Sequence, residues 1–411
     1  MKKFTTTFAL LLVLSFTLVS ISEIGIVKAE GTIYIRADGS VEGTDKIHRN
    51  GNVYTLTDNI DVYKGSVSFS AGIKVERNDV VIDGCGYSIQ AQEYVYSGID
   101  LTERSNVTIK NMQLCGFEYG IYLQSSSRNT IYGNNITANS FGGIKLASFT
   151  INSVVVGCSL NSIYNNNITG NSGEGISLNT SPKNNIHDNN ITNNGYDGLY
   201  LDRSSYNNTI LRNDIKNNGR DGIICLIYSG GNRISGNDIA NNKGNGVTLT
   251  LNSNVNIISE NNILNNTHGI DINNSEYPSN NTISGNNITS NNIGIGISAS
   301  SDNRIYHNNF VNNTLHASII FDSFNVGDND FEGNYWDDYA GVDNDGDGIG
   351  DTPYIIDQSN QDNYPRMEVF IIPEFPSWTP ILLMLIVLAV AVAVYKRKLP
   401  KTANSTIIFD A

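Results

Sequence analysis

The stretch Asn161-Ser-Ile-Tyr-Asn-Asn-Asn-Ile-Thr-Gly-Asn171, which continues to Gly175-Ile-Ser-Leu178, contains the pattern that decides the fold. Its frame reads N-x-I-x-x-N-x-I-x-x-N, followed by a glycine and an alternating I-x-L. A frame that returns along a chain predicts a repeat architecture in which each repeat is one small structural unit. The frame starts again at Asn129, Asn184, Asn208 and Asn232, and in looser form at Asn256, Asn281 and Asn303.

A glycine followed by an aliphatic residue marks the same point of every repeat. Neighbouring members of this series are 23, 32, 23, 24, 24, 23 and 25 residues apart. Repeats this short, with aliphatic residues at every second position, predict several short strands separated by turns and leave no room for a helix. One repeat cannot enclose a core, so the repeats must stack. The series is Gly120, Gly143, Gly175, Gly198, Gly222, Gly246, Gly269 and Gly294.

The spacing inside the frame gives the geometry of one coil. Aliphatic residues two positions apart share one face of a strand, whereas the step of five from Ile131 to Ile136 requires a corner. Asparagine suits such corners because it tolerates left-handed backbone, and stacked asparagines can form amide ladders. The sequence therefore predicts an all-β, parallel β-helix of about ten coils of 22–25 residues. Right-handed winding follows from the general preference of parallel crossovers.

The repeats occupy the middle of a longer chain. A spacing of 32 residues reveals an insertion at 149–160, which should leave the stack as a loop. Open ends of a β-helix expose unpaired strands, so we expect a cap at each end. The predicted segments are a signal peptide (1–29), an N-terminal cap (30–71), the repeats (72–324), an acidic Gly/Asp-rich C-terminal cap (325–370), a linker (371–377), a transmembrane helix (378–395) and a cytoplasmic tail (396–411).

Both termini indicate a membrane. Lys2-Lys3 and the apolar run 8–19 are typical of a secretory signal. This signal is expected either to be cleaved near Ala29 or to stay uncleaved as a membrane anchor. The uncharged residues 378–395 would cover about 27 Å as a helix. Because Lys396-Arg397-Lys398 follows, the tail is expected in the cytoplasm and the β-helix at the cell surface.

Charge and cysteine content limit the partners. A net charge of −14 disfavours nucleic acid, and a single solenoid of this kind is expected to be a monomer. Cys225 stands where other repeats have an inward leucine, so a buried thiol is expected. A bridge between Cys85 and Cys115 is left open, as are the state of Cys158 and glycosylation of the many Asn-x-Ser/Thr sequences.

Acidic residues alternate with small ones in the predicted C-terminal cap. In a calcium loop, oxygens at positions one, three, five, seven and nine surround the ion, and a glycine stands at position six. Here the twelfth position is Tyr354, where an EF-hand has glutamate, so the alternative is an acidic turn without metal. The expected Ca²⁺ ligands are Asp343, Asp345, Asp347, the Ile349 carbonyl and Asp351.

Outward positions of the repeats supply the candidates for a binding or catalytic face. The residue before the register glycine is acidic in three successive repeats, as Glu174, Asp197 and Asp221. These carboxylates could form a catalytic column, or they could be there only because polar residues favour a corner before glycine. Tyr122, Lys145 and Tyr200 stand between the paired aliphatic residues, where an aromatic ring could stack on a sugar.

The repeats resemble those of the copper-binding periplasmic NosD family and of the wider class of carbohydrate-binding and sugar-hydrolysing β-helices. The block Gly333-Asn-Tyr-Trp-Asp-Asp-Tyr339, together with residues 348–354 and 362–365, is similar to the terminal block of archaeal NosD-like surface proteins, and Pro373-Glu-Phe-Pro376 to archaeal sorting signals. The resemblance implies copper delivery, but copper is not expected from the residues because the histidines are scattered and interpreted as surface or turn residues. They are His48, His187, His268, His307 and His316.

Three function classes follow from these observations. The first is a membrane-anchored surface β-helix that binds a polysaccharide or another envelope glycan, or has a structural role in the envelope. The second is an extracellular polysaccharide lyase or hydrolase, because such enzymes place carboxylates on one outer face of a β-helix. The third is a NosD-like copper accessory protein.

Overall fold

The computed structural model describes residues 31–63, 70–273, 279–320 and 329–371 of the chain. These residues form 42 strands, and no α-helix occurs among them. Within the described ranges, no helix is long and apolar enough to cross a membrane. The predicted signal peptide, transmembrane helix and cytoplasmic tail, and all but the first residue of the linker, lie outside the described residues.

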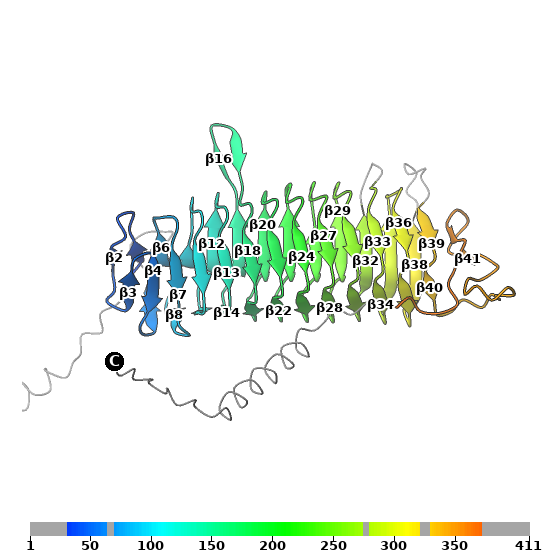
Figure 1. Cartoon of the computed structure of the whole chain (residues 1–411), viewed down its shortest axis with the longest axis horizontal. Helices are drawn as coiled ribbons and strands as arrows, with labels where there is room; N and C mark the ends of the chain where they lie inside the picture. Colours follow the sequence, from blue (N-terminus) through cyan, green and yellow to red (C-terminus); the bar gives the residue numbers. More distant parts are fainter. Residues whose placement is uncertain (1–30, 64–69, 274–278, 321–328, 372–411) are drawn as a thin grey trace, which may run out of the picture. The chain divides into compact units, whose positions relative to one another are not determined.

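The described residues of the unit that ends at Phe370 form a stack of coils, whose strands make three long sheets that are parallel except at the edge strands β2 (Val41–Glu42), β3 (Ile47–Asn50) and β41 (Tyr354–Ile355) (Figure 1). The 13-stranded sheet contains, in order, β2 (Val41–Glu42), β1 (Ile33–Ile35), β6 (Ala71–Val75), β9 (Ser97–Asp100), β12 (Tyr119–Gln124), β15 (Gly142–Ala147), β20 (Ile176–Asn179), β23 (Leu199–Asp202), β26 (Ile223–Cys225), β29 (Val247–Thr250), β32 (His268–Asn273), β35 (Ile293–Ser298) and β38 (Leu315–Ile320).

The other two sheets form the remaining sides of each coil. The 15-stranded sheet contains β3 (Ile47–Asn50), β4 (Val53–Leu56), β7 (Val81–Asp83), β10 (Thr108–Lys110), β13 (Thr130–Tyr132), β18 (Ser162–Tyr164), β21 (Asn185–His187), β24 (Thr209–Leu211), β27 (Arg233–Ser235), β30 (Ile257–Ser259), β33 (Thr282–Ser284), β36 (Arg304–Tyr306), β39 (Asp330–Glu332), β42 (Gln361–Asp362) and β41 (Tyr354–Ile355). The 12-stranded sheet contains β40 (Tyr335–Trp336), β37 (Asn309–Val311), β34 (Asn287–Thr289), β31 (Asn262–Leu264), β28 (Asp238–Ala240), β25 (Asp214–Lys216), β22 (Asn190–Thr192), β19 (Asn167–Thr169), β14 (Asn135–Thr137), β11 (Gln113–Cys115), β8 (Ser88–Ala91) and β5 (Ile60–Val62).

The predicted all-β parallel β-helix is confirmed, and eleven parallel strands of the 13-stranded sheet, from β6 to β38, give eleven coils where about ten were predicted. The aliphatic residues of the frame stack in register, so that Ile163 lies between Ile131 and Ile186 in neighbouring coils. All three are fully buried. Columns of isoleucine on the three sheets therefore form one continuous core.

Three ladders of buried asparagine run beside this core. Nδ2 of Asn129 donates to Oδ1 of Asn161 at 3.0 Å, and Nδ2 of Asn161 donates in turn to Oδ1 of Asn184 at 2.9 Å. The ladders confirm the predicted stacking, but the left-handed backbone lies one residue earlier than the sequence suggested. In the second ladder it falls on Asn165, Asp188 and Arg212, directly before the buried asparagines. The residue with left-handed backbone thus forms the corner outside the core, and the asparagine that follows it points its side-chain amide inward.

Strands also enter both predicted caps. β1, β4 and β5 pair in parallel with β6, β7 and β8, so the predicted N-terminal cap adds one coil before the eleven that start at β6, as well as the antiparallel edge strands β2 and β3. At the other end β39 and β40 continue the stack, and β41 pairs antiparallel with β42.

The insertion leaves the stack as predicted. Its residues form the hairpin of β16 (Phe149–Ile151) and β17 (Val154–Val156), which projects beyond the coils (Figure 1). The hairpin is antiparallel and forms its own two-stranded sheet.

The four cysteines are free thiols. Cys225 lies inward between Leu201 and Leu249, as predicted. The bridge left open between Cys85 and Cys115 is not formed. The register explains why, since Cys115 lies opposite Gln90 whereas Cys85 occupies the exposed corner before that strand.

Candidate functional site

One outward column of the 13-stranded sheet contains all three predicted ligand-binding residues. Its members lie at the same position of successive coils, because the register between these strands is constant. Tyr122 pairs with Lys145, Lys145 with Ser177, and Ser177 with Tyr200. The part of this column from β12 to β32, called here the outer column, is Tyr122, Lys145, Ser177, Tyr200, Ile224, Thr248 and Asp271.

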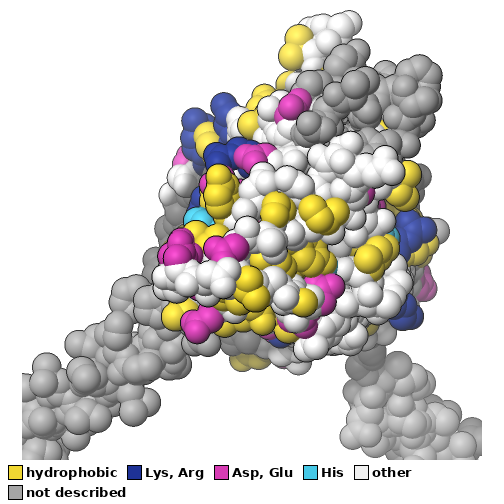
Figure 2. Space-filling view, turned by 90° about the vertical axis from the view of Figure 1, so that its right-hand side faces the viewer, with side chains coloured by type: hydrophobic (Ala, Val, Ile, Leu, Met, Phe, Trp, Pro, Cys, Tyr) yellow, Lys and Arg dark blue, Asp and Glu magenta, His cyan; other side chains and the backbone are white. Residues whose placement is uncertain are grey.

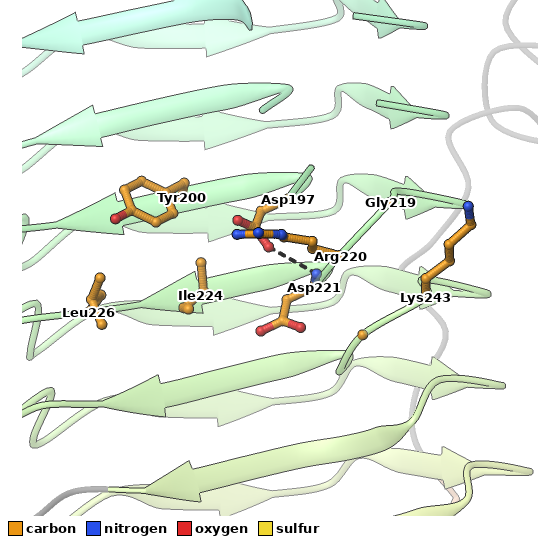
Figure 3. Close-up of a pocket in the computed structure, with 9 residues that line it drawn as sticks. Asp197, Tyr200, Gly219, Arg220, Asp221, Ile224, Leu226 and Lys243 are labelled. Carbon is orange, nitrogen blue, oxygen red and sulfur yellow. Dashed lines mark hydrogen bonds between the residues drawn. The ribbon is translucent and has the colours of Figure 1, made fainter. Parts of the chain in front are cut away.

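A cleft of about 470 Å³ opens beside the middle of the outer column. Tyr200 and Ile224 contribute from the column itself, and Asp197 and Asp221 from the turn before each strand. Figure 3 shows the guanidinium of Arg220 beside the carboxyl of Asp197, with Lys243 on the side of both that faces away from Tyr200. The structure thus brings two carboxyl groups, a phenol and two cations around one hollow.

The predicted acidic column is a hydrogen-bonded ladder. Oδ1 of Asp197 accepts the backbone N–H of Asp221 at 2.9 Å (Figure 3). Oδ1 of Asp221 accepts the backbone N–H of Asn245 at 2.8 Å. Oδ2 of Asp221 also accepts the hydroxyl of Thr248 at 2.6 Å. His268 continues the ladder by donating its backbone N–H to Oδ1 of Asn245 at 3.1 Å. These acids therefore have a structural role at the corners, and two of them also line the cleft.

Burial controls the protonation of Asp197. Only 4% of the residue is exposed, and loss of hydration raises the pKa of its carboxyl to about 7. The neighbouring charges of Asp221 and Glu174 raise this pKa further, whereas Arg220 lowers it. Near neutral pH the carboxyl of Asp197 is therefore partly protonated and able to donate a proton.

Glu174 belongs to the same column, but it does not line the cleft. Its backbone carbonyl accepts the N–H of Gly143 at 3.0 Å, and one coil later the carbonyl of Asp197 accepts the N–H of Gly175 at 3.0 Å in the same way. Of the three predicted acidic residues, the structure brings Asp197 and Asp221 together in the cleft and leaves Glu174 beside it.

Lys145 is the second residue of the outer column, next to Tyr122. Its Nζ donates to the hydroxyl of Ser177 at 2.8 Å, and burial lowers the pKa of its ammonium. Nearby, burial raises the pKa of Asp202, whose Oδ1 is a buried oxygen without a hydrogen-bond partner. Charged groups are therefore partly dehydrated along this face, which strengthens their interaction with a polar ligand.

An aromatic cluster surrounds Tyr122 and was not predicted. The ring of Tyr96 lies 5.0 Å from that of Tyr122, and Tyr119 lies 5.9 Å from Tyr122. Phe141, 46% exposed, packs against Tyr119 at 5.3 Å. Tyr119 and Tyr122 both lie in β12 and in register with the neighbouring strands, whereas Tyr96 and Phe141 stand in the turns before β9 and β15.

The acidic loop in the C-terminal cap brings three of its predicted metal ligands together. The carboxylate oxygens of Asp343, Asp345 and Asp347 lie within 4.8 Å of one another. Oδ2 of Asp343 accepts the N–H of Gly348 at 2.9 Å, and this bond lowers the pKa of Asp343. Convergent carboxylates at this spacing suit a hard cation.

The other two predicted ligands have different contacts. Asp351 accepts the backbone N–H of Asn344 at 2.9 Å, and the N–H of Ile349 donates to Oδ1 of Asp347 at 2.8 Å. The end of the stack that carries this loop exposes several groups of acidic side chains (Figure 2).

His316 contradicts the prediction that the histidines are surface or turn residues. It is 5% exposed, and its Nε2 lies 2.7 Å from Oδ1 of Asp337. The amide nitrogen of Asn313 faces Nδ1, because the amide oxygen accepts the backbone N–H of Asn291. Nδ1 is then the acceptor and Nε2 carries the proton donated to Asp337. A ring nitrogen of His316 and carboxylate oxygens of Asp337 and Asp338 lie within 4.8 Å of one another.

Comparison with known sequences points to the same architecture. A family described as "Right handed beta helix region" matches residues 45–210 and 151–310. The probable ABC transporter binding protein NosD of Stutzerimonas stutzeri is 39% identical over 75 residues, which cover 18% of this chain. The match spans only 17% of that relative's length.

Two solved structures illustrate the likeness in fold. A point mutant of the periplasmic alginate epimerase AlgG superposes with a TM-score of 0.52 at 19% identity, covering 74% of this chain and 77% of the epimerase. The A-module of the mannuronan C-5 epimerase AlgE6 from Azotobacter vinelandii gives a TM-score of 0.50 at 16% identity, covering 69% of this chain and 80% of the module. At these identities the likeness concerns the fold alone.

Proposed function

This chain belongs to the right-handed β-helix family, and we propose that it binds an extended polysaccharide along the outer face of its 13-stranded sheet. The observation that carries the proposal is the outer column, which runs without interruption from the tyrosine cluster at Tyr122 to the cleft beside Tyr200. A chain of sugar rings needs such a long face with repeated contacts. The two similar solved structures are named as epimerases of alginate and mannuronan, which supports a polysaccharide as the ligand class.

The residues of this face supply the contacts that sugars need. Exposed aromatic faces such as Phe141 stack against the apolar faces of sugar rings. Arg220 and Lys243 line the cleft and can donate hydrogen bonds to sugar hydroxyls, and the carboxyl of Asp221 can accept hydrogen bonds from them. The ligand therefore gains apolar contact at one end of the face and polar contact at the other.

Binding to a panel of polysaccharides tests the proposal, with product release measured in the same wells. We expect one class of polysaccharide to bind, and Tyr200→Ala to weaken that binding at least tenfold. Tyr164→Ala is the matched control, because Tyr164 is an outward tyrosine on the 15-stranded sheet, stacked 5.0 Å from Tyr132. Equal losses in both variants, or no binding to any polysaccharide, would contradict the proposed face.

A second candidate function is cleavage of that polysaccharide by a lyase or hydrolase reaction. It is favoured by the cleft, where the partly protonated carboxyl of Asp197 lies next to the carboxylate of Asp221. Release of oligosaccharides that Asp197→Asn abolishes, while binding persists, would support it. If the wild-type chain binds the polysaccharide but releases no oligosaccharide, the cleavage function is contradicted and only the binding function is supported.

Two expectations from the sequence accompany this function. The chain is proposed to lie at the cell surface, anchored by residues 378–395, with the β-helix outside. Protease added to intact cells should then degrade the β-helix, and full protection of its accessible sites would contradict this location. Calcium is proposed to bind Asp343, Asp345 and Asp347, with the Ile349 carbonyl and Asp351 completing the loop.

A further inference from the structure

The hairpin of β16 and β17, called here the arm, exposes apolar side chains away from the stack. Val154, Val155 and Val156 are 62%, 51% and 37% exposed, and Phe149 is 50% exposed. Because successive residues of a strand point to opposite faces, both faces of β17 are apolar and open to solvent. A two-stranded hairpin alone is marginally stable in water, so such a surface indicates a partner.

The strand edges of the arm are also unprotected. Among the described residues, β16 and β17 pair with no strand other than each other, so no strand covers the outer edge of either. The main stack, in contrast, covers edges with the antiparallel strands β2, β3 and β41. Proteins usually block a free edge with lysine or proline, yet residues 148–160 contain no proline and no charged residue.

The base of the arm is held firmly. The hydroxyl of Ser125 donates to the carbonyl of Val156 at 2.9 Å, and the N–H of the buried Cys158 donates to the hydroxyl of Ser181 at 3.2 Å. The arm therefore leaves the stack from a fixed point, which suits docking against one defined partner.

We propose that β17 pairs antiparallel with β17 of a second copy of this chain, which gives a four-stranded sheet across a two-fold axis. Such pairing places Val155 opposite Val155 of the other copy, a self-complementary contact of the kind that two-fold interfaces need. Two bodies of net charge −14 repel each other, and the uncharged arm allows them to associate at a distance. The proposed dimer replaces the monomer expected from the repeats alone.

A lipid bilayer fits this surface less well. The unpaired backbone groups of both edges would lose their hydration in the bilayer core without gaining partners. The tip of the arm is Asn152-Ser153, two polar residues with left-handed backbone. A strand edge, in contrast, satisfies the backbone groups and covers the valines at once.

Cross-linking of the full chain in the cells that produce it tests the dimer. In a Cys85→Ser background, which removes the exposed thiol, Val155→Cys should give a product of twice the chain mass with a short bis-maleimide. The peptide joined to residue 155 should be the same arm segment of a second copy. Val255→Cys is the matched control, since Val255 is 60% exposed at a corner of the stack, and should give no dimer.

Adding Val154→Lys should reduce the cross-linked dimer at least tenfold, because a charged edge resists pairing. The thermal unfolding midpoint should not change, which separates loss of pairing from loss of folding. The dimer would be ruled out by the absence of a double-mass product, by a product that Val154→Lys leaves intact, or by a cross-link to another protein. None of these outcomes depends on whether the outer column binds a polysaccharide.

Discussion

Nδ2 of Asn334 donates to Oδ2 of Asp362 at 3.0 Å, and this contact ends the second asparagine ladder. Every asparagine within the ladder accepts from the preceding coil and donates to the next, as Asn308 does to Asn334 at 3.0 Å. A final asparagine would have a buried donor and no further coil to receive it. Asp362 only accepts, so an aspartate closes a ladder of asparagines without an unpaired donor.

Removal of this closing carboxylate should destabilise the C-terminal end of the stack. Asp362 is fully buried and also accepts from the indole Nε1 of Trp336 at 3.1 Å and the N–H of Gly333 at 2.9 Å. Asp362→Ala leaves these donors unpaired and should lower the free energy of unfolding by at least about 3 kcal/mol. Urea denaturation measures the change. Asp330→Ala, at an exposed position nearby, should change it by less than about 0.5 kcal/mol.

A charge in the isoleucine column should disrupt the coils. Ile168 is fully buried between Ile136 and Ile191 of the neighbouring coils. Ile168→Asp buries a carboxyl without a partner and should lower the free energy of unfolding by at least about 3 kcal/mol. The adjacent outward substitution Thr169→Asp is the control for β propensity. Similar unfolding curves for the two variants, recorded by far-UV circular dichroism, would contradict the core assignment.

Stability should depend on pH through Asp197. Its folded-state pKa of about 7 lies above the ordinary value of about 3.9, so the folded protein binds this proton more tightly than the unfolded chain. The favourable contribution is complete below about pH 4 and is lost as the pH rises through about 7.

Asp197→Asn keeps an acceptor for the N–H of Asp221 but cannot ionise. Relative to the wild type, the variant should therefore gain stability between pH 4 and pH 8, by at most about 4 kcal/mol. Comparing the two chains cancels the titration of Asp202 and Asp271, whose pKa values burial also raises. A difference that stays constant over this range would show that Asp197 is ionised throughout.

Calcium should stabilise the folded chain. Binding to Asp343, Asp345 and Asp347 offsets their mutual repulsion, with affinity near the roughly 10⁻⁴–10⁻³ M of extracellular sites. The unfolding midpoint should rise with added calcium, and Asp345→Ala should abolish that rise. Glu332→Ala, an exposed acid outside the loop, should leave it intact. An unchanged midpoint after chelation, with no heat of binding at millimolar calcium, would identify the loop as an acidic turn.

The regular coils could be derived from the sequence because their contacts repeat at nearly constant spacing. Once Gly175-Ile176 and Gly198-Leu199 mark the register, Ser177 must lie beside Tyr200, and the outer column follows residue by residue. The same periodicity places the buried isoleucines and the asparagine ladders. In such a solenoid, contacts between coils are set by the local pattern alone.

Only the tertiary structure decided the features that depend on irregular segments or on burial. Tyr96 contacts Tyr122 and Phe141 contacts Tyr119 from the turns before β9 and β15, and His316 in β38 meets Asp337 of the cap that follows the repeats. The raised pKa of Asp197 arises because neighbouring coils remove its water and bring Asp221 and Arg220 beside it. Sequence spacing determines which residues are neighbours in the stack. It does not determine how much solvent reaches them, since that depends on side chains from several coils packing together.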